Sequence, residues 1–117
     1  GVEGLSENIT IISVVDKFLE HPRVMIFGER GEEEVYISSS DWMTRNLDNR
    51  VEVTCPIYDE DIKQEIIETF EISWADNVKA REITQYQDNA YRKSDRPRVR
   101  SQFATYDYYL KKLGFLQ

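Results

Sequence analysis

Apolar side chains recur along this chain with two different periods, and the change between them predicts the order of its helices and strands. From residue 6 or 8 to residue 20 the apolar positions lie three or four apart, which predicts an opening helix. Proline disfavours helical geometry at the residue before it, so Pro22 should end this helix at His21. We therefore expect His21 to lie at a helix C-terminus.

Two stretches rich in Val, Ile, Tyr and Phe come next and predict a β-hairpin. They cover residues 23–27 and 34–38, with glycines at positions 28 and 31 between them. Turn-forming residues from 41 to 49 predict a short irregular or helical turn at the sheet edge. Residues 50–56 alternate apolar and polar side chains, which predicts a third strand with one face toward the core.

The second half of the chain predicts two helices. One begins near Asp59 and should pack on the sheet through an apolar stripe. The stripe consists of Ile62, Ile66, Phe70 and Trp74. The other helix covers residues 101–113 and stops at Gly114. Its apolar face consists of Phe103, Tyr106, Leu110 and Leu113.

Between these helices, residues 77–100 have weak periodicity, and we expect a long connection with a short strand near 78–83. Together the elements predict the α/β (α+β) class, with a mixed β-sheet flanked by helices. A length of 117 residues suits a single domain, 1–117, in which residues after about 100 form the C-terminal helix. The chain begins with Gly1 rather than methionine, which suggests a piece of a longer protein.

Composition narrows the range of partners. The formal net charge of −7 disfavours a general binder of nucleic acid or membrane surfaces, because most of the surface would repel a polyanion. No apolar run is long enough to span a bilayer, and the only cysteine, Cys55, cannot form an internal disulfide. A reduced, cytoplasmic setting fits these features best.

Positive charge is nevertheless concentrated in one window. Its cations are Arg92, Lys93, Arg96, Arg98 and Arg100. A polyanion that bound this protein would bind there. The alternative is a solvated connection before the last helix.

The stretch 21–52 holds residue types that suit phosphate chemistry. His21 exchanges a proton near neutral pH, and beside a transferring phosphate it can act as an acid for the leaving oxygen or as a nucleophile. Arg23 lies two residues further on, so in extended backbone both side chains project from one face. A guanidinium there can hold two phosphate oxygens. Alternatively, both are ordinary surface residues, with His21 favoured by the helix dipole.

Other polar residues in this stretch also have two interpretations each. The serines at 38–40, followed by Asp41, offer hydroxyl and N–H groups to an anion, yet they are common in plain turns. Arg45 can supply a second cation, or pair with Asp41 or Asp48. Glu52 can orient the imidazole by accepting a hydrogen bond, or it can face solvent.

Several blocks of this sequence resemble one known family. The central block is Ser40-Asp41-Trp42-Met43-Thr44-Arg45-Asn46-Leu47-Asp48. The others are residues 4–9, 18–21, 34–39, 50–53, 76–81 and 99–102. In this order they closely resemble the C-terminal region of polyphosphate kinase of the large, phospholipase-D-like type. Asp76, Asn77, Lys79 and Arg81 are typical of that family but have no assigned chemical role, and we regard them as candidates for a structural one.

The phospholipase D superfamily has the pattern H-x-K, then G-S-x-N, then a glutamate. In this resemblance His21 matches the histidine, Ser39 the serine, and Glu52 the glutamate that orients the imidazole. Arg23 stands where lysine is usual, and Asp41 where asparagine is usual. The two departures disfavour a phosphodiesterase and agree with the kinase. The fold implied is a phospholipase-D-like half-domain.

The resemblance implies reversible transfer of the terminal phosphate of ATP to inorganic polyphosphate, through a phosphohistidine and with Mg²⁺. Because such sites are built from two motifs, the phosphorylated histidine and the magnesium ligands would lie outside this piece. His21 would contact ATP and act as general acid toward the leaving ADP, with Glu52 orienting it. The residues implied to bind the ATP phosphates are His21, Arg23, Ser39, Asp41 and Arg45.

The same resemblance gives the basic window a function. Arg96, Arg98 and Arg100 would line the path of the polyphosphate chain. The partners implied are ATP or ADP, polyphosphate and the rest of the parent chain, which is expected to form a homo-oligomer. This piece alone should be inactive.

Two other function classes stay open. One is a phosphodiesterase half-site that is completed by dimerisation. The other is a non-catalytic interaction module with an exposed aromatic surface. That surface would comprise Tyr106, Tyr108, Tyr109 and Phe115.

Overall fold

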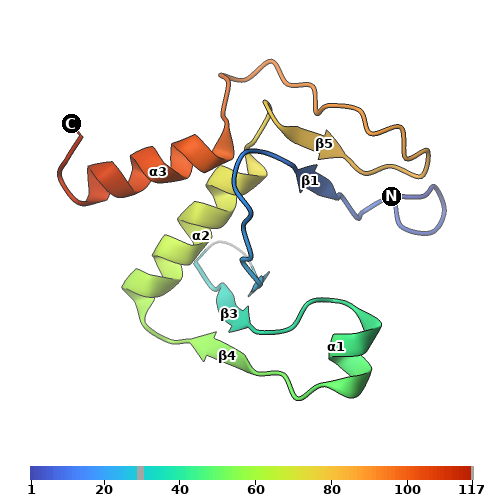
Figure 1. Cartoon of the computed structure of the whole chain (residues 1–117), viewed down its shortest axis with the longest axis horizontal. Coiled ribbons are helices and arrows are strands. Elements are labelled where there is room, and N and C mark those ends of the chain that lie inside the picture. Colours follow the sequence, from blue (N-terminus) through green and yellow to red (C-terminus); the bar gives the residue numbers. More distant parts are fainter. Residues whose placement is uncertain (29–30, 117) are drawn as a thin grey trace. The chain divides into compact units, whose positions relative to one another are not determined.

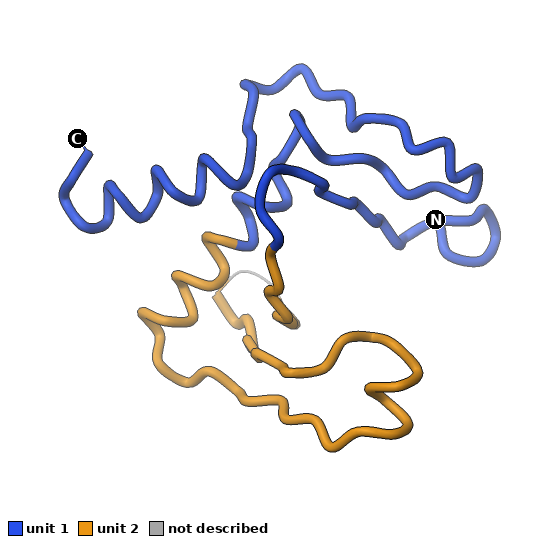
Figure 2. Tube along the Cα trace, in the orientation of Figure 1, with its two compact units in different colours: residues 1–19, 70–117 blue, residues 20–69 orange. Residues whose placement is uncertain are grey.

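The computed structural model describes residues 1–28 and 31–116, and the chain divides into two compact units (Figures 1 and 2). Unit 1 consists of residues 1–19 and 70–117, and unit 2 of residues 20–69. The length predicts one domain, but each unit has its own β-sheet, which accounts for the division. Every helix among the described residues is too short or too polar to traverse a bilayer.

Unit 2 is built on a three-stranded antiparallel sheet in the order β2 (Val24–Phe27), β3 (Glu34–Ser38) and β4 (Thr54–Ile57). The β2–β3 pair confirms the predicted hairpin. The predicted α/β class is confirmed, but this sheet is antiparallel rather than mixed. Consecutive strands are neighbours here, whereas a parallel pair needs a crossover connection. Val35 in the central strand is buried and forms the apolar centre of this unit.

The third strand begins later than the alternation of side chains predicts. Val51 and Val53, which that alternation turns toward the core, are 98% and 65% exposed. Beyond the last ladder pair, the Ser39 hydroxyl accepts a hydrogen bond from the Val53 N–H at 3.0 Å, in place of a backbone carbonyl. The ladder ends here at a side chain. The alternation of apolar and polar residues before Thr54 therefore does not mark a strand with a buried face.

The two helices in the middle of the chain are found where the sequence predicts them. The predicted turn after β3 contains α1 (Thr44–Asn49), and the predicted long helix is α2 (Glu60–Trp74), which contributes to both units. Asp59 caps α2, since its Oδ1 accepts the Ile62 N–H at 3.0 Å. No residue of α2 is buried, however, so the expected packing of its apolar stripe is not complete within this chain.

The opening helix is the largest error of the sequence prediction. Instead, β1 (Ile12–Val14) pairs antiparallel with β5 (Ala80–Glu82), near the predicted short strand, and both belong to unit 1. Isoleucine and valine favour extended backbone, because branching at Cβ restricts them in a helix. The pairing partner lies far along the chain, where no local period can show it.

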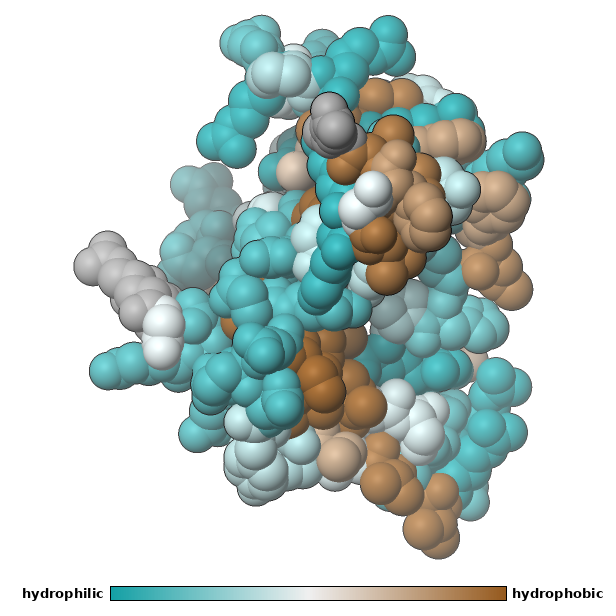
Figure 3. Space-filling model, turned by 90° about the vertical axis from the view of Figure 1, so that its left-hand side faces the viewer, coloured by the Kyte–Doolittle hydropathy of each residue, from teal (hydrophilic) through white to brown (hydrophobic). Residues whose placement is uncertain are grey.

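The last helix, α3 (Ser101–Lys112), is confirmed, and Gly114 follows it with a φ of +78°. Its predicted apolar face is largely exposed. Figure 3 shows several patches of apolar surface on the molecule. The exposed large apolar side chains on α3 and just beyond it are Phe103, Tyr106, Tyr109, Leu113, Phe115 and Leu116.

A buried carboxylate joins the parts of unit 1. The Asp76 side chain follows α2 and is completely buried. Its Oδ1 accepts the N–H groups of Val78, Lys79 and Ala80 at 3.0, 2.7 and 2.8 Å, and its Oδ2 accepts the Ser101 N–H at 2.7 Å. Burial raises the pKa of Asp76, but the four donors together outweigh it, so the net pKa lies below its ordinary value.

Further contacts hold the segment that precedes α3. The backbone N–H of Asn77 donates to the Val99 carbonyl at 3.0 Å, and its Oδ1 accepts the Val99 N–H at 2.8 Å. The Gln102 side chain brackets Phe18, accepting its N–H at 2.9 Å and donating to its carbonyl at 2.7 Å. The long connection is therefore pinned to the rest of unit 1 at its end.

We expect Asp76→Asn to lower the free energy of unfolding by about 3 kcal/mol, because the new amide group faces a buried N–H donor and leaves it unpaired. Urea denaturation measures this. Asp107→Asn on the exposed side of α3 removes the same charge and should leave the midpoint unchanged. Equal midpoints for the two variants would refute the role assigned to Asp76.

The unmodified protein and Asp76→Asn should also differ in how their stability depends on pH. Because the pKa of Asp76 is lowered in the folded state, its stabilisation is present above the unfolded pKa of about 3.9 and is lost as pH falls through the folded value. The gap in stability between the unmodified protein and Asp76→Asn should therefore shrink below about pH 4.

Candidate phosphate-binding site

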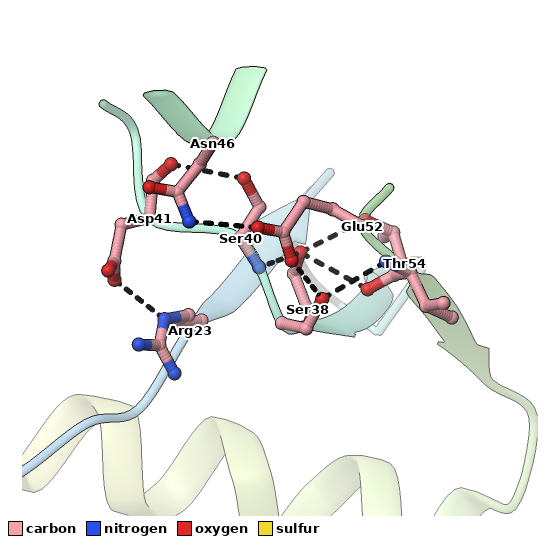
Figure 4. A network of polar contacts seen from close by, with 9 residues as sticks. Arg23, Ser38, Ser40, Asp41, Asn46, Glu52 and Thr54 are labelled. Carbon is pink, nitrogen blue, oxygen red and sulfur yellow. Dashed lines mark hydrogen bonds and ion pairs between the residues drawn. The ribbon is translucent and has the colours of Figure 1, made fainter. Parts of the chain in front are cut away.

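An ion pair lies at one end of the unit 2 sheet (Figure 4). Arg23, just before β2, donates from Nε to Oδ1 of Asp41 at 2.6 Å. Asp41 lies in the loop between β3 and α1, and both side chains are partly exposed. Among the described residues, no hydrogen bond engages the Nη groups of Arg23, so this end of the guanidinium is open to a ligand.

The electrostatics of this pair favour its charged form. The hydrogen bond from Arg23 holds the pKa of Asp41 below its usual range, and the charges of His21 and Arg45 lower it further. In turn the bond to Asp41 raises the pKa of Arg23. The positive charge beside the Asp41 carboxylate therefore comes chiefly from the guanidinium of Arg23, and Arg45 adds to it.

A pocket of about 250 Å³ opens beside the ion pair. It is lined by Pro22, Arg23, Val24, Met25, Ser38, Ser40, Asp41 and Trp42. The lining combines a guanidinium, two hydroxyl groups and an exposed indole. A guanidinium, hydroxyl groups and an open cavity thus meet at this point of the chain.

A second polar cluster lies next to this pocket, centred on Glu52. The Ser39 hydroxyl donates to Oε2 of Glu52 at 2.5 Å. Nδ2 of Asn46 donates to Oε1 of Glu52 at 2.8 Å (Figure 4). The Ser39 bond, followed by the Asn46 bond, keeps the pKa of Glu52 below its ordinary value. Glu52 is therefore ionised at neutral pH and is bound at both oxygens.

These contacts change the roles that the sequence suggested for two residues. Within residues 1–28 and 31–116, the side chains that donate to Glu52 are Ser39 and Asn46, and His21 is not among them. Ser39 does not line the pocket either, while Ser38 and Ser40 do. Ser39 thus acts on Glu52 and on the end of the ladder rather than directly on an anion in this pocket.

His21 and Arg45 are placed near the pocket without lining it. His21 is exposed and stands directly before Pro22, in the irregular segment ahead of β2 rather than at a helix end. Arg45 lies exposed on α1, and no ion pair joins it to Asp41 or Asp48 within the described residues. Both act electrostatically on Asp41, which lines the pocket.

Sequence reasoning missed Asn46. It is the one buried residue of α1, at 2% exposure. Asparagine is common in turns, and the stretch around it has the composition of a turn, so no pattern distinguishes it from its polar neighbours. Its burial comes from the contact with Glu52, which depends on the tertiary fold.

The basic window of unit 1 contains two kinds of arginine. Arg100 makes two bonds to Asp16, from Nε at 2.7 Å and from Nη2 at 2.6 Å, and it lies 4.4 Å from the centre of the Phe103 ring. The Asp16 side chain is only 2% exposed, and the bond from Arg100 lowers its pKa. Arg100 therefore holds the fold together, whereas Arg96 and Arg98 are exposed.

A metal site within the described part of the chain would need a group of side chains that could bind the ion. In residues 1–28 and 31–116, no three His, Cys, Asp or Glu side chains are grouped so that they could hold an ion. The carboxylates of the site, Asp41 and Glu52, are each engaged by donors of the protein.

The structure defines an α/β domain with a pocket lined by an arginine and hydroxyl groups, and comparison with known proteins gives its family. Residues 1–102 match the family described as "Polyphosphate kinase C-terminal domain 2". The chain belongs to the polyphosphate kinase family, as a C-terminal domain.

Individual relatives agree with this assignment. The polyphosphate kinase of Vibrio parahaemolyticus is 55% identical over 109 residues, and that of Escherichia coli K12 is 48% identical over 108. Each alignment covers 92% of this chain and 16% of the relative. The crystal structure of polyphosphate kinase from Porphyromonas gingivalis matches with a TM-score of 0.85 and 46% identity, over 92% of this chain and 17% of that one.

We expect Ser39→Ala to raise the pKa of Glu52 toward its ordinary value of 4.5, because the Ser39 hydroxyl is the main cause of its lowered pKa. A carbon-13 NMR titration of the side-chain carboxyl groups measures this. Ser40→Ala is the matched control, since the Ser40 hydroxyl donates to the Asp41 carbonyl and not to Glu52. An unshifted Glu52 in Ser39→Ala would contradict the assigned contact.

Proposed function

We propose that this chain provides part of the ATP-phosphate site of a polyphosphate kinase, which reversibly transfers the terminal phosphate of ATP to inorganic polyphosphate. The observation that carries the proposal is the open end of the Arg23 guanidinium beside the pocket, in a chain that belongs to this family. The chain spans 16% of the length of the curated relatives cited above, so the remaining parts of the site would come from elsewhere in the parent protein.

Arg23 is the main phosphate ligand in this proposal. Its Nε is held by Asp41, which sets the plane of the guanidinium and leaves both Nη groups to donate to two oxygens of one phosphate. Because Arg23 is oriented before the ligand arrives, little conformational entropy is lost on binding. Arg45 adds positive charge near the same position. Asp41 therefore acts by orienting Arg23, and it does not touch the phosphate.

His21 would serve as the general acid. The terminal phosphate moves from ATP to a histidine outside this chain, and the oxygen of the departing ADP takes a proton from the imidazolium of His21. In the reverse direction His21 accepts that proton. Its exposed place before Pro22 leaves the imidazole free to approach a nucleotide held at Arg23. Glu52 supports this arrangement indirectly, since it is bound to Ser39 and Asn46.

Other parts of the proposal concern the parent protein. Mg²⁺ would accompany ATP and neutralise phosphate charge, with ligands from the nucleotide and from residues outside this chain. The parent would act as a homo-oligomer in the cytoplasm, a setting supported by the single, unpaired Cys55. A phosphodiesterase is not favoured. In the phospholipase D pattern a lysine is usual at position 23 and an asparagine at position 41, and the two residues that replace them here, Arg23 and Asp41, pair with each other.

In the full-length protein, we expect His21→Ala to reduce ATP-dependent synthesis of acid-insoluble phosphate by about 10²-fold or more, because the leaving ADP loses its proton donor. Gln64→Ala, on the exposed side of α2, should retain activity. Unchanged synthesis in His21→Ala would remove His21 from the chemistry, provided that its unfolding midpoint is normal. Absence of synthesis in the unmodified protein would overturn the proposed function itself.

The exposed cations of the basic window suit the polyphosphate chain. We infer that Arg96 and Arg98 contact it, and that Arg100 does not, since its guanidinium is held by Asp16. Successive cations along one segment attract a repeating anion. The backbone of this segment is fixed by the bond from Asn77 Nδ2 to the Pro97 carbonyl at 2.9 Å, so the two arginines are presented from an ordered segment.

We expect Arg96→Gln combined with Arg98→Gln to weaken binding of polyphosphate to the full-length protein. The slope of log affinity against log salt should also fall by about 1 to 2 units, because fewer counterions are released. Lys17→Gln combined with Lys111→Gln removes the same charge elsewhere and serves as the control. Identical affinity and salt dependence in the two double variants would contradict the inference.

A further inference from the structure

A buried asparagine in a short, otherwise exposed helix is the starting observation. Asn46 is almost completely buried, while the other residues of α1 are exposed. Burying an amide has a cost unless it is hydrogen-bonded, and asparagine is not a strong helix former. Its Nδ2 donates to Glu52, while its buried Oδ1 has no hydrogen-bond partner among the described residues. Neither helix propensity nor apolar burial explains this residue, so the bond to Glu52 is the polar contact that its side chain gains by being buried.

That contact closes the loop that follows β3. Glu52 receives a hydrogen bond from Ser39, at the start of the loop, and another from Asn46, just beyond its end (Figure 4). One carboxylate therefore joins the two sides of the segment 39–46. Asp41 and Trp42, which line the pocket, lie within this closed segment.

Two backbone hydrogen bonds connect Asn46, which is bound to Glu52, to Asp41. The Asn46 N–H donates to the Met43 carbonyl at 2.9 Å, and the Met43 N–H donates to the Asp41 carbonyl at 2.8 Å. Asp41 in turn holds Nε of Arg23. A continuous series of hydrogen bonds thus runs from Glu52 through Asn46 to the guanidinium beside the pocket.

We propose that Asn46 is a positioning residue of the phosphate pocket, which acts through Glu52 and the 39–46 loop to hold Asp41 and, through it, Arg23. The inference rests on the proposed function, because it takes the pocket as the ATP-phosphate site. Loss of the anchor frees the loop and leaves the charges of Arg23 and Asp41 in place. Binding of ATP should therefore suffer more than the chemical step.

The test exchanges the partners of one hydrogen bond in full-length polyphosphate kinase. Asn46→Asp sets a second carboxylate against Glu52 and should raise KM for ATP about tenfold, with kcat changed less than about threefold. Adding Glu52→Gln restores the bond in the opposite direction, from the glutamine amide to the carboxylate introduced on α1, and leaves an oxygen for Ser39. This double variant should recover most of the loss in KM. Asn49→Asp, an exposed neighbour on the same helix, should behave like the unmodified protein.

Hydrogen exchange separates the possible outcomes. In the unliganded protein, exchange at the Met43 and Asn46 amides should accelerate in Asn46→Asp and return toward normal in the double variant. Recovered exchange without recovered KM would overturn the positioning role and leave a purely structural one. Recovered exchange and KM, with kcat still low, would show that the Glu52 charge acts on the reaction directly. If the unmodified protein makes no polyphosphate, the proposed function fails and the positioning role with it, while exchange still decides whether Asn46 anchors the loop.

Discussion

The convergence of four backbone N–H groups on the buried Asp76 carboxylate is the interaction on which unit 1 depends. Among the described residues the fully buried apolar side chains are only Val35 and Ala80, so apolar packing within this chain does not by itself position the elements. Asp76 binds the approach to β5 and the start of α3 with one side chain. A charged acceptor makes each of these bonds stronger than a neutral one. The geometry of unit 1 is therefore set by polar contacts to an unusual degree.

Unit 2 also contains a carboxylate that binds donors from separate segments, in this case near the surface. Glu52 is also an ionised carboxylate surrounded by neutral donors, and it also joins segments that are separate in sequence. The difference lies in what the anchored segment carries. At Asp76 the anchored elements are structural, whereas the loop held by Glu52 contributes Asp41 and Trp42 to the pocket. The stiffness of the pocket and the stability of the fold thus have a common physical origin.

The sequence predicts the local elements well and the long-range pairings poorly. The hairpin, α2 and α3 each have a pattern within a few residues, and each is found. The strand β1 has the local period of a helix, and its pairing with β5 is invisible to that period. The site follows the same division. The residue types of Arg23 and Asp41 make them candidates, and the structure pairs them, but nothing local identifies the partners of Glu52. Asn46 and Asp16 acquire their roles only when distant segments meet.

The short distance between Arg23 and Asp41 has a consequence for how such a site can evolve. Lysine has no Nε–H donor at that point of its side chain, so replacing the arginine alone would leave a partly buried carboxylate without its partner. Replacing the aspartate alone would leave a guanidinium with no balancing charge. The arginine at position 23 and the aspartate at position 41 thus depend on each other, and a lineage that lost one of the two would gain little by keeping the other.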